Sequence, residues 1–198
     1  TTGKPYFLSR PRRFGKSLLL STLEAYFLGR KDLFKGLAIE QLEKDWKVYP
    51  VLHLSLNAQF YENKRSLEQV LDAHFIQWEK KYGETDKEVG YSARFMQIIQ
   101  QACEKTGEKV VVLIDEYDKP LLHTLFNDDL HDVYREMLTG FYTVLKDADR
   151  YLRFVFITGV TKFSQLGIFS NLNQLIDISM APDYATVCGM TKVEIERD

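Results

Sequence analysis

Hydrophobic residues along the chain fall into two kinds of segment. Short, nearly continuous apolar runs lie near residues 5–9, 50–56, 109–114, 152–158 and, more weakly, 174–180. Runs of this length, rich in β-branched and aromatic side chains, predict buried strands. The segments between them are longer and mix apolar with polar residues, as amphipathic helices do. Alternating strands and helices favour an α/β fold with three layers (αβα) and a mostly parallel five-stranded sheet.

Helices are expected where apolar side chains recur at intervals of three and four. Residues 18–27, 66–78, 93–104 and 128–145 each place their apolar side chains on one face. The pattern is most regular in the last of these segments, which should form a long helix. Residues 33–46 are less regular and are expected to form short helical pieces.

Capping signals mark the start of several of these helices. Residues 66–69 and 191–194 have the spacing of a capping box. Asp118 is expected to cap the turn ahead of Pro120, a residue suited to the first turn of a helix, although it could also assist in a site. Because residue 191 would begin a helix that the chain end cuts short, and because no methionine precedes Thr1, we expect a fragment of a longer protein.

The turn after the first predicted strand reads RPRRFGKS at residues 10–17. A strand, a basic glycine-containing loop, Gly-Lys-Ser and a helix form a phosphate-binding P-loop in that order. Backbone N–H groups at the start of a helix lack partners and carry partial positive charge, so they bind phosphate. Gly15 lets the backbone approach the phosphates. Lys16 would reach the β- and γ-phosphates, and Ser17 would place its hydroxyl on Mg²⁺.

This loop departs from the general pattern G-x-x-x-x-G-K-[ST], because Arg10 stands at the first glycine. Pro11 favours an extended Arg10 and removes one amide donor, so the cradle of amides should be slightly poorer. Arg12 and Arg13 either compensate with their charge or point to solvent. Taken alone, the segment could also be a basic turn before an amphipathic helix.

A second signature follows the most apolar predicted strand, where VVVLI at residues 110–114 runs directly into Asp115 and Glu116. Open α/β sheets bind their ligands at the carboxyl ends of the strands. Asp115 would hold Mg²⁺ through its water shell, and Glu116 would orient and deprotonate the attacking water. Thr158, at the end of another strand, would hydrogen-bond that water or the γ-phosphate. The alternatives are a helix cap for Asp115, a surface charge for Glu116 and a simple turn at Thr158.

Together the two signatures predict an ATP-binding domain that uses Mg²⁺. The prediction requires that Lys16 and Asp115 meet at one rim of a single sheet, with room for a triphosphate between them. The predicted nucleotide-binding residues are Arg12, Arg13, Phe14, Gly15, Lys16, Ser17 and Leu18; the predicted metal ligands are Ser17 and Asp115; and the predicted catalytic residues are Glu116, Lys16 and Thr158.

The composition of the chain mainly excludes classes of protein and kinds of site. A net charge of −2 over 198 residues gives no overall field that would favour nucleic acid. The two cysteines, Cys103 and Cys188, make neither a disulfide framework nor a metal quartet. No apolar run approaches the ~20 residues that span a bilayer, and no signal peptide is visible. We therefore expect a cytoplasmic protein with reduced thiols and no membrane partner.

Three strings of the sequence resemble the predicted AAA-ATPase-like family, and the similarity extends over nearly the whole chain. They are YFLSRPRRFGKSLLLSTLEAYF at 6–27, KVVVLIDEYDKPLL at 109–122 and RFVFITGVTKFSQLGIFSNLNQL at 153–175. The resemblance implies an additional-strand P-loop ATPase. In that fold one core strand is inserted between the two phosphate-site strands, and the strand order is 5-1-4-3-2. Arg10 in place of glycine also matches this family's pattern.

Members of that family often carry a PD-(D/E)xK nuclease-like domain after the ATPase domain. Pro182 and Asp183 resemble the start of such a motif, but Glu196 stands where its lysine should be. We therefore expect residues 1–198 to be a single P-loop ATPase core, with the helical lid and any nuclease-like domain outside it.

The expected activity is hydrolysis of ATP to ADP and phosphate with Mg²⁺, driving or gating a C-terminal domain. Two alternatives stay open: a nucleotide-controlled switch with little turnover, and a nucleic-acid-associated module that uses Arg12 and Arg13. A homo-oligomer and nucleic acid bound through the missing domain are further partners that the sequence leaves open. The candidates for an arginine finger, by charge alone, are Arg135, Arg150 and Arg153.

Overall fold

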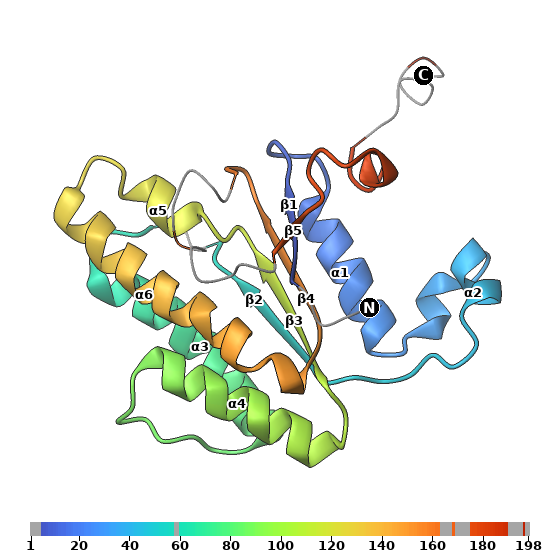
Figure 1. Ribbon diagram of the computed structural model, residues 1–198, viewed down its shortest axis with the longest axis horizontal. Helices are drawn as coiled ribbons and strands as arrows, with labels where there is room; N and C mark the ends of the chain where they lie inside the picture. Colours follow the sequence, from blue (N-terminus) through green and yellow to red (C-terminus); the bar gives the residue numbers. More distant parts are fainter. Residues whose placement is uncertain (1–4, 58–59, 163–167, 169–174, 190–195, 197–198) are drawn as a thin grey trace.

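The computed structural model describes residues 5–57, 60–162, 168, 175–189 and 196, and in it strands and helices alternate along the chain (Figure 1). The elements are β1 (Pro5–Ser9), α1 (Lys16–Phe27), η1 (Lys31–Phe34), α2 (Ala38–Leu42), β2 (Val51–Ser55), α3 (Lys64–Tyr82), α4 (Tyr91–Thr106), β3 (Val110–Asp115), α5 (Lys119–His123), α6 (Asp128–Asp147), η2 (Asp149–Tyr151), β4 (Leu152–Gly159), β5 (Ile176–Asp177) and η4 (Pro182–Tyr184). The α/β class and the predicted helical segments among the described residues are confirmed. No helix in these described ranges is both long and apolar enough to cross a bilayer.

The five strands form one sheet in the order β2-β3-β4-β1-β5, and every neighbouring pair is parallel. Strand β4 therefore lies between β1, which precedes the Gly-Lys-Ser loop, and β3, which ends at Asp115. Counted from the opposite edge, this is the predicted order 5-1-4-3-2. The predicted strand at residues 174–180 is shorter than expected, since β5 contains only Ile176 and Asp177.

Helices cover both faces of the sheet, as the three-layer prediction requires. Helices α3, α4 and α6 lie on one face and α1 lies on the other (Figure 1). Side chains of a strand point alternately to the two faces. In β3, Val110, Val112 and Ile114 therefore pack with the three helices, while Val111 and Leu113 pack with α1. Every residue of β3 is buried, which explains its uninterrupted apolar run.

Two of the predicted caps are wrong in detail. Helix α3 begins at Lys64 with Asn63 as its N-cap, so Ser66 is inside the helix. The hydroxyl of Ser66 accepts a hydrogen bond from the Asn63 N–H at 3.3 Å, so it closes the cap from the third helical position. Asp118 precedes α5 as expected, but its side chain makes no cap hydrogen bond. The predicted cap at residues 191–194 lies outside the described residues.

Candidate functional site

Three strands end at one rim of the sheet, because β1, β4 and β3 are parallel neighbours. The loop that follows β1 leads into α1, and Asp115 is the last residue of β3. The Ser17 hydroxyl donates a hydrogen bond of 2.6 Å to Asp115 Oδ2. Since Ser17 directly follows Lys16, the two sequence signatures meet although about a hundred residues separate them.

Asp115 is a buried carboxylate with 5% of its surface exposed, and it accepts three hydrogen bonds. Besides Ser17, the Thr158 hydroxyl donates to Asp115 Oδ1 at 2.7 Å and the Glu116 N–H donates to the same oxygen at 3.0 Å. These donors fix the orientation of the carboxylate. The groups that donate to Asp115 lie at strand ends and at the start of α1. The Asp115 carboxylate therefore bonds across the rim of the sheet and does not cap a helix that follows it.

Lys16 is buried to a similar degree, with 6% exposed. Its ammonium donates to the carbonyl oxygens of Arg10 at 2.9 Å and of Pro11 at 3.0 Å. Across the described part of the chain, no carboxylate lies within 4.0 Å of this ammonium. A buried cation that only neutral carbonyls contact retains a strong attraction for an anion.

The first turn of α1 adds unpaired N–H groups beside this cation. Gly15 is the N-cap with a left-handed φ of 82°, and no side chain caps the helix. The first N–H with a helical acceptor is that of Leu19, which donates to the Gly15 carbonyl at 2.9 Å. The amides of Lys16, Ser17 and Leu18 therefore have no acceptor within the helix, as an anion site at a helix N-terminus requires.

The remaining predicted loop residues lie at the surface. Arg12 and Arg13 are exposed, and Arg13 has a left-handed φ of 68°. Phe14 is 43% exposed and Leu18 is 72% exposed. All four are accessible to a ligand that binds on the outside of the loop.

Arg10, at the position of the first glycine, points away from the loop. Its guanidinium donates to the carbonyl oxygens of Ser179, of Ser9 at 3.1 Å and of Tyr184 at 3.5 Å. The Ser9 N–H also donates to the Ser179 hydroxyl at 2.8 Å. The residue that breaks the general motif therefore ties the end of β1 to the segment that follows β5.

The two other predicted catalytic residues adjoin Asp115. Thr158 is fully buried, and its hydroxyl is directed to the Asp115 carboxylate. Glu116 has a left-handed φ of 53°. Residues other than glycine rarely adopt this backbone conformation, and backbone strain of this kind is concentrated at functional sites. The structure thus brings Lys16, Ser17, Asp115, Glu116 and Thr158 to one rim.

Sequence reasoning missed a second lysine at this rim. Lys119 Nζ lies 3.4 Å from Glu116 Oε2, and it donates a hydrogen bond to Asn57 Oδ1. The spacing of three residues between Glu116 and Lys119 is a signal that could have revealed the ion pair. Asn57 lies just beyond β2, the strand next to β3, so the predicted sheet would have placed it at the same rim.

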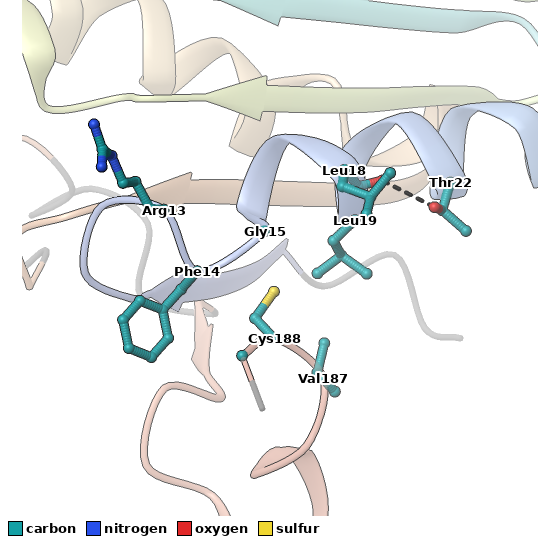
Figure 2. Close-up of a pocket in the computed structure, with 9 residues that line it drawn as sticks. Arg13, Phe14, Gly15, Leu18, Leu19, Thr22, Val187 and Cys188 are labelled. Atoms are coloured by element: carbon teal, nitrogen blue, oxygen red, sulfur yellow. Dashed lines mark hydrogen bonds between the residues drawn. The ribbon is translucent and has the colours of Figure 1, made fainter. Parts of the chain in front are cut away.

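A cavity of about 480 Å³ adjoins the loop. It lies between the start of α1 and the segment that follows η4 (Figure 2). Burial raises the pKa of the Cys188 thiol, against the nearby charges of Arg10 and Lys16, so this wall of the cavity is uncharged. The lining residues are Arg13, Phe14, Gly15, Leu18, Leu19, Thr22, Val187, Cys188 and Gly189.

Comparison with known proteins gives one family and one relative. The model of the AAA-ATPase-like family, described as "Predicted AAA-ATPase", matches residues 1–169. The chain is also 40% identical over 195 residues to a protein of Azotobacter chroococcum mcd 1 described as "Uncharacterized protein in vnfD 5'region". That alignment covers 98% of this chain and 38% of the relative, so the chain spans less than half the length of the relative.

Proposed function

The chain belongs to the predicted AAA-ATPase family, and we propose that it binds ATP and hydrolyses it with Mg²⁺ to ADP and phosphate. The observation that carries this proposal is the pair of buried, opposite charges at the sheet rim. Lys16 and Asp115 do not neutralise each other, because among the described residues the Lys16 ammonium donates to carbonyls and the Asp115 carboxylate accepts from hydroxyls and an amide. A triphosphate with its cation would balance both charges.

The phosphates would bind at the loop and the first turn of α1. The ammonium of Lys16 would leave its carbonyl partners for the β- and γ-phosphates, and the amides of Lys16, Ser17 and Leu18 would donate to phosphate oxygens. Exposed Arg12 and Arg13 would add positive charge from outside the loop. These groups replace the amide that Pro11 removes.

Mg²⁺ fits the oxygens that are present. Magnesium is commonly bound through one or two protein oxygens together with water and substrate phosphates. Ser17 Oγ and Asp115 Oδ2 would serve in this way. The described residues contain no group of three His, Cys, Asp or Glu side chains that would hold a metal alone, so the phosphates are needed to complete the site. When bound, the ion supplies positive charge to the phosphoryl group in transfer.

Hydrolysis would depend on Glu116 and Thr158. Glu116 would accept a proton from a water whose oxygen attacks the γ-phosphorus. The bond from that phosphorus to the bridging oxygen breaks, and ADP leaves with the electron pair. Thr158 would orient the water or a γ-phosphate oxygen through its hydroxyl, which lies within hydrogen-bond reach of Asp115.

The cavity beside the loop would take the nucleoside. It is contiguous with Gly15 and is lined on one side by Leu18 and Leu19 and on the other by Val187. Apolar walls suit the faces of a flat base, and a cavity of about 480 Å³ lies within the usual size range of small-molecule sites.

We further propose that turnover drives or gates another part of a longer protein. The support is the contact of Arg10 with Ser179 and Tyr184, which joins the phosphate loop to the segment after β5. The relative extends well beyond the matched region, which is consistent with additional domains.

Steady-state ATP hydrolysis tests the enzyme proposal. Wild type should release phosphate only with Mg²⁺, and Glu116→Gln should bind ATP but turn over at least ~100-fold more slowly, since general-base assistance contributes ~10²–10⁴-fold. Glu62→Gln, an exposed glutamate in the loop before α3, is the matched control. Tight ATP binding without Mg²⁺-dependent turnover in wild type would favour the nucleotide-controlled switch.

Calorimetric titration with ATP tests the binding site. Lys16→Ala should abolish measurable binding, because it removes the buried cation, while Lys35→Ala at an exposed position should bind as wild type does. Unchanged affinity in Lys16→Ala would refute the assignment of the phosphate site.

A further inference from the structure

Asp118 is a buried carboxylate that the proposed chemistry does not use. Only 1% of its surface is exposed. Its Oδ2 accepts hydrogen bonds from the N–H groups of Val160 at 3.0 Å and Thr161 at 2.6 Å. These amides belong to the chain that leaves β4, so Asp118 bonds across the rim and not to the helix that it precedes.

Tyr117 reinforces the same connection. Its N–H donates to the Thr158 carbonyl and its hydroxyl donates to the Thr161 carbonyl, both at 3.0 Å. Burial, with a further contribution from the Asp118 charge, raises the pKa of Tyr117 far above its usual value, so the hydroxyl keeps its proton as a donor. The backbone beyond β4 is therefore bonded to two consecutive side chains that follow Glu116.

Gly159 makes this close approach possible. A Cβ at Gly159 would lie 2.4 Å from the Tyr117 ring and 2.8 Å from Asp118 Oδ1. Real Cβ atoms do not approach other atoms so closely, so any other residue here would displace the two side chains. The second carboxylate oxygen of Asp118 thus faces the space that a Cβ at Gly159 would occupy.

The position of these bonds relative to the strand ladder shows what they do. The last paired residues of β3 and β4 are Ile114 and Ile157. Asp115, Glu116 and Thr158 all lie beyond that pair, where the Tyr117 N–H bond to the Thr158 carbonyl continues the backbone contact between the two chains. Asp118 lies two residues after Glu116, and its partners lie two and three residues after Thr158. The hydrogen bonds of Asp118 therefore join the two chains beyond Glu116 and Thr158, the candidate catalytic residues.

We propose that Asp118 is a positioning residue, which holds the end of β4 against the Asp-Glu segment so that Thr158 and Glu116 keep a fixed relative geometry. This rests on the proposed ATPase function and adds a determinant of the chemical step. Loss of the carboxylate leaves the N–H groups of Val160 and Thr161 without their acceptor. The chain after Thr158 is then held by fewer bonds, those of Tyr117 and the pairing of Gly159 with Ser9. Nucleotide affinity depends on Lys16 and the first turn of α1, which Asp118 does not contact, so the loss should affect turnover and leave binding unchanged.

Turnover and affinity, measured separately, test this role. We expect Asp118→Ala to lower the single-turnover rate of ATP hydrolysis by ~100-fold, the cost typical of a catalytic group displaced by about 1 Å. The dissociation constant for a fluorescent ATP analogue should stay within about twofold of wild type, as expected when only the transition state is affected. Asp118→Asn keeps one acceptor oxygen and should recover part of the rate. Asp132→Ala, an exposed aspartate on α6 paired with Arg135, is the matched control.

Each result decides between the two proposals. Wild-type turnover with an unchanged rate in Asp118→Ala overturns the positioning role alone. Parallel loss of affinity, rate and thermal stability in both Asp118 variants also overturns it, because a merely structural residue would behave in that way. If Asp118→Ala does not fold, Asp118→Asn carries the test: a lowered rate with unchanged affinity and weakened exchange protection of the Val160 and Thr161 amides supports the role, and a wild-type rate despite weakened protection overturns it. Absence of turnover in wild type overturns the ATPase proposal and this inference with it.

Discussion

Among the described residues, the charges buried between α3 and α4 and those buried at the sheet rim are balanced in different ways. Between α3 and α4, Arg94 is 6% exposed and Glu79 is 3% exposed. The Arg94 guanidinium lies 2.9 Å from Glu79 and 2.6 Å from Asp72. The Thr85 hydroxyl donates to Glu79, and the Tyr91 hydroxyl donates to Asp72 at 3.0 Å. Each charge in this helix cluster therefore has an opposite charge in contact.

The sheet rim holds a similar amount of buried charge without such pairing. Lys16 and Asp115 are as inaccessible as Arg94, with 6% and 5% exposed. Neutral oxygens contact Lys16, and Ser17 and Thr158 hydroxyls contact Asp115. Neutral hydroxyls and carbonyls do not balance a full charge, so Lys16 and Asp115 each keep an attraction for a ligand group of opposite charge.

The difference separates charge that stabilises the fold from charge that is available to a ligand. Burial of charged groups costs free energy, and a partner of opposite charge offsets much of this cost. In the helix cluster, side chains of the protein itself offset the cost of burying each charge. At the sheet rim, a ligand that carries both an anion and a cation would offset that cost. Burial alone therefore does not identify a charge that is available to a ligand. A missing counter-charge does not either, because Asp118 is buried without one among the described residues and its Oδ2 accepts two backbone N–H bonds; at the rim the additional signs are the opposite charges of Lys16 and Asp115 beside the unpaired amides of α1.

The largest effect should come from breaking the helix cluster. Arg94→Met leaves Glu79 buried without its partner, and we expect the free energy of unfolding to fall by about 3–5 kcal/mol. Urea denaturation measures the change, and ATP affinity should be unaffected because α3 and α4 do not form the rim. The double variant Arg94→Met/Glu79→Leu removes both charges and should recover most of the stability. Equal instability of the single and double variants would contradict this account.

A smaller effect is expected from removing one hydroxyl at the rim. Thr158→Val keeps the shape of the side chain but takes one hydrogen bond from the buried Asp115 carboxylate, which should cost about 1.5–3 kcal/mol. Thermal unfolding with and without ATP and Mg²⁺ reports the change. Thr158→Ser, which restores the hydroxyl, should lie close to wild type. Similar instability in both variants would show that the methyl group matters more than the hydrogen bond.

Removing the unpaired cation should change stability least among these substitutions, and in the opposite direction. Lys16→Met replaces a buried ammonium that has no counter-charge in the described part of the chain, so we expect the protein without ATP to be as stable as wild type or up to about 1 kcal/mol more stable. The stabilisation that ATP confers on wild type should disappear. A loss of stability as large as that in Arg94→Met would mean that Lys16 belongs to the structural framework.

Acid titration tests the ion pairs of the helix cluster in a second way. It does not require a large change in the stability of the protein near neutral pH. Burial would raise the pKa of Glu79, but hydrogen bonds from Arg94 and Thr85 and the Arg94 charge outweigh it and hold the pKa below its usual value of 4.5. Glu79 therefore contributes stability above that usual value, and the contribution is lost as the pH falls through the lowered pKa. The difference in unfolding free energy between wild type and Glu79→Gln should shrink as the pH falls below about 4.5. A difference that does not vary with pH would contradict the ion-pair account.

Much of the fold follows from patterns that are local in sequence. The strand at β3 was predicted from its uninterrupted apolar run, and the run exists because both faces of a central parallel strand are covered. The long helix α6 was predicted from apolar spacing, and the Asn127 side chain caps it by accepting the Leu130 N–H at 3.2 Å. The order of the strands came from the family resemblance, because spacing alone does not specify which parallel strands become neighbours.

The candidate site was predictable for the same reason, since Gly-Lys-Ser and Asp-Glu each follow a strand directly. The contacts of two neighbouring residues, Asp118 and Arg10, were not predictable. Asp118 stands before Pro120 and was assigned to a cap, yet its acceptor oxygen serves Val160 and Thr161. Arg10 was assessed only as a missing glycine, and its contact with Ser179 depends on how the chain returns after β5.

The sequence by itself determined the strands, the helices and the chemical identity of the groups at the strand ends, because hydrophobic periodicity and loop motifs are written within a few neighbouring residues. Only the tertiary structure decided which buried charges would be paired. Whether Arg94 meets Glu79, or Lys16 meets no carboxylate among the described residues, depends on distances of a few ångströms between segments far apart along the chain. Coulomb attraction and desolvation act over those distances, so composition and spacing do not encode them.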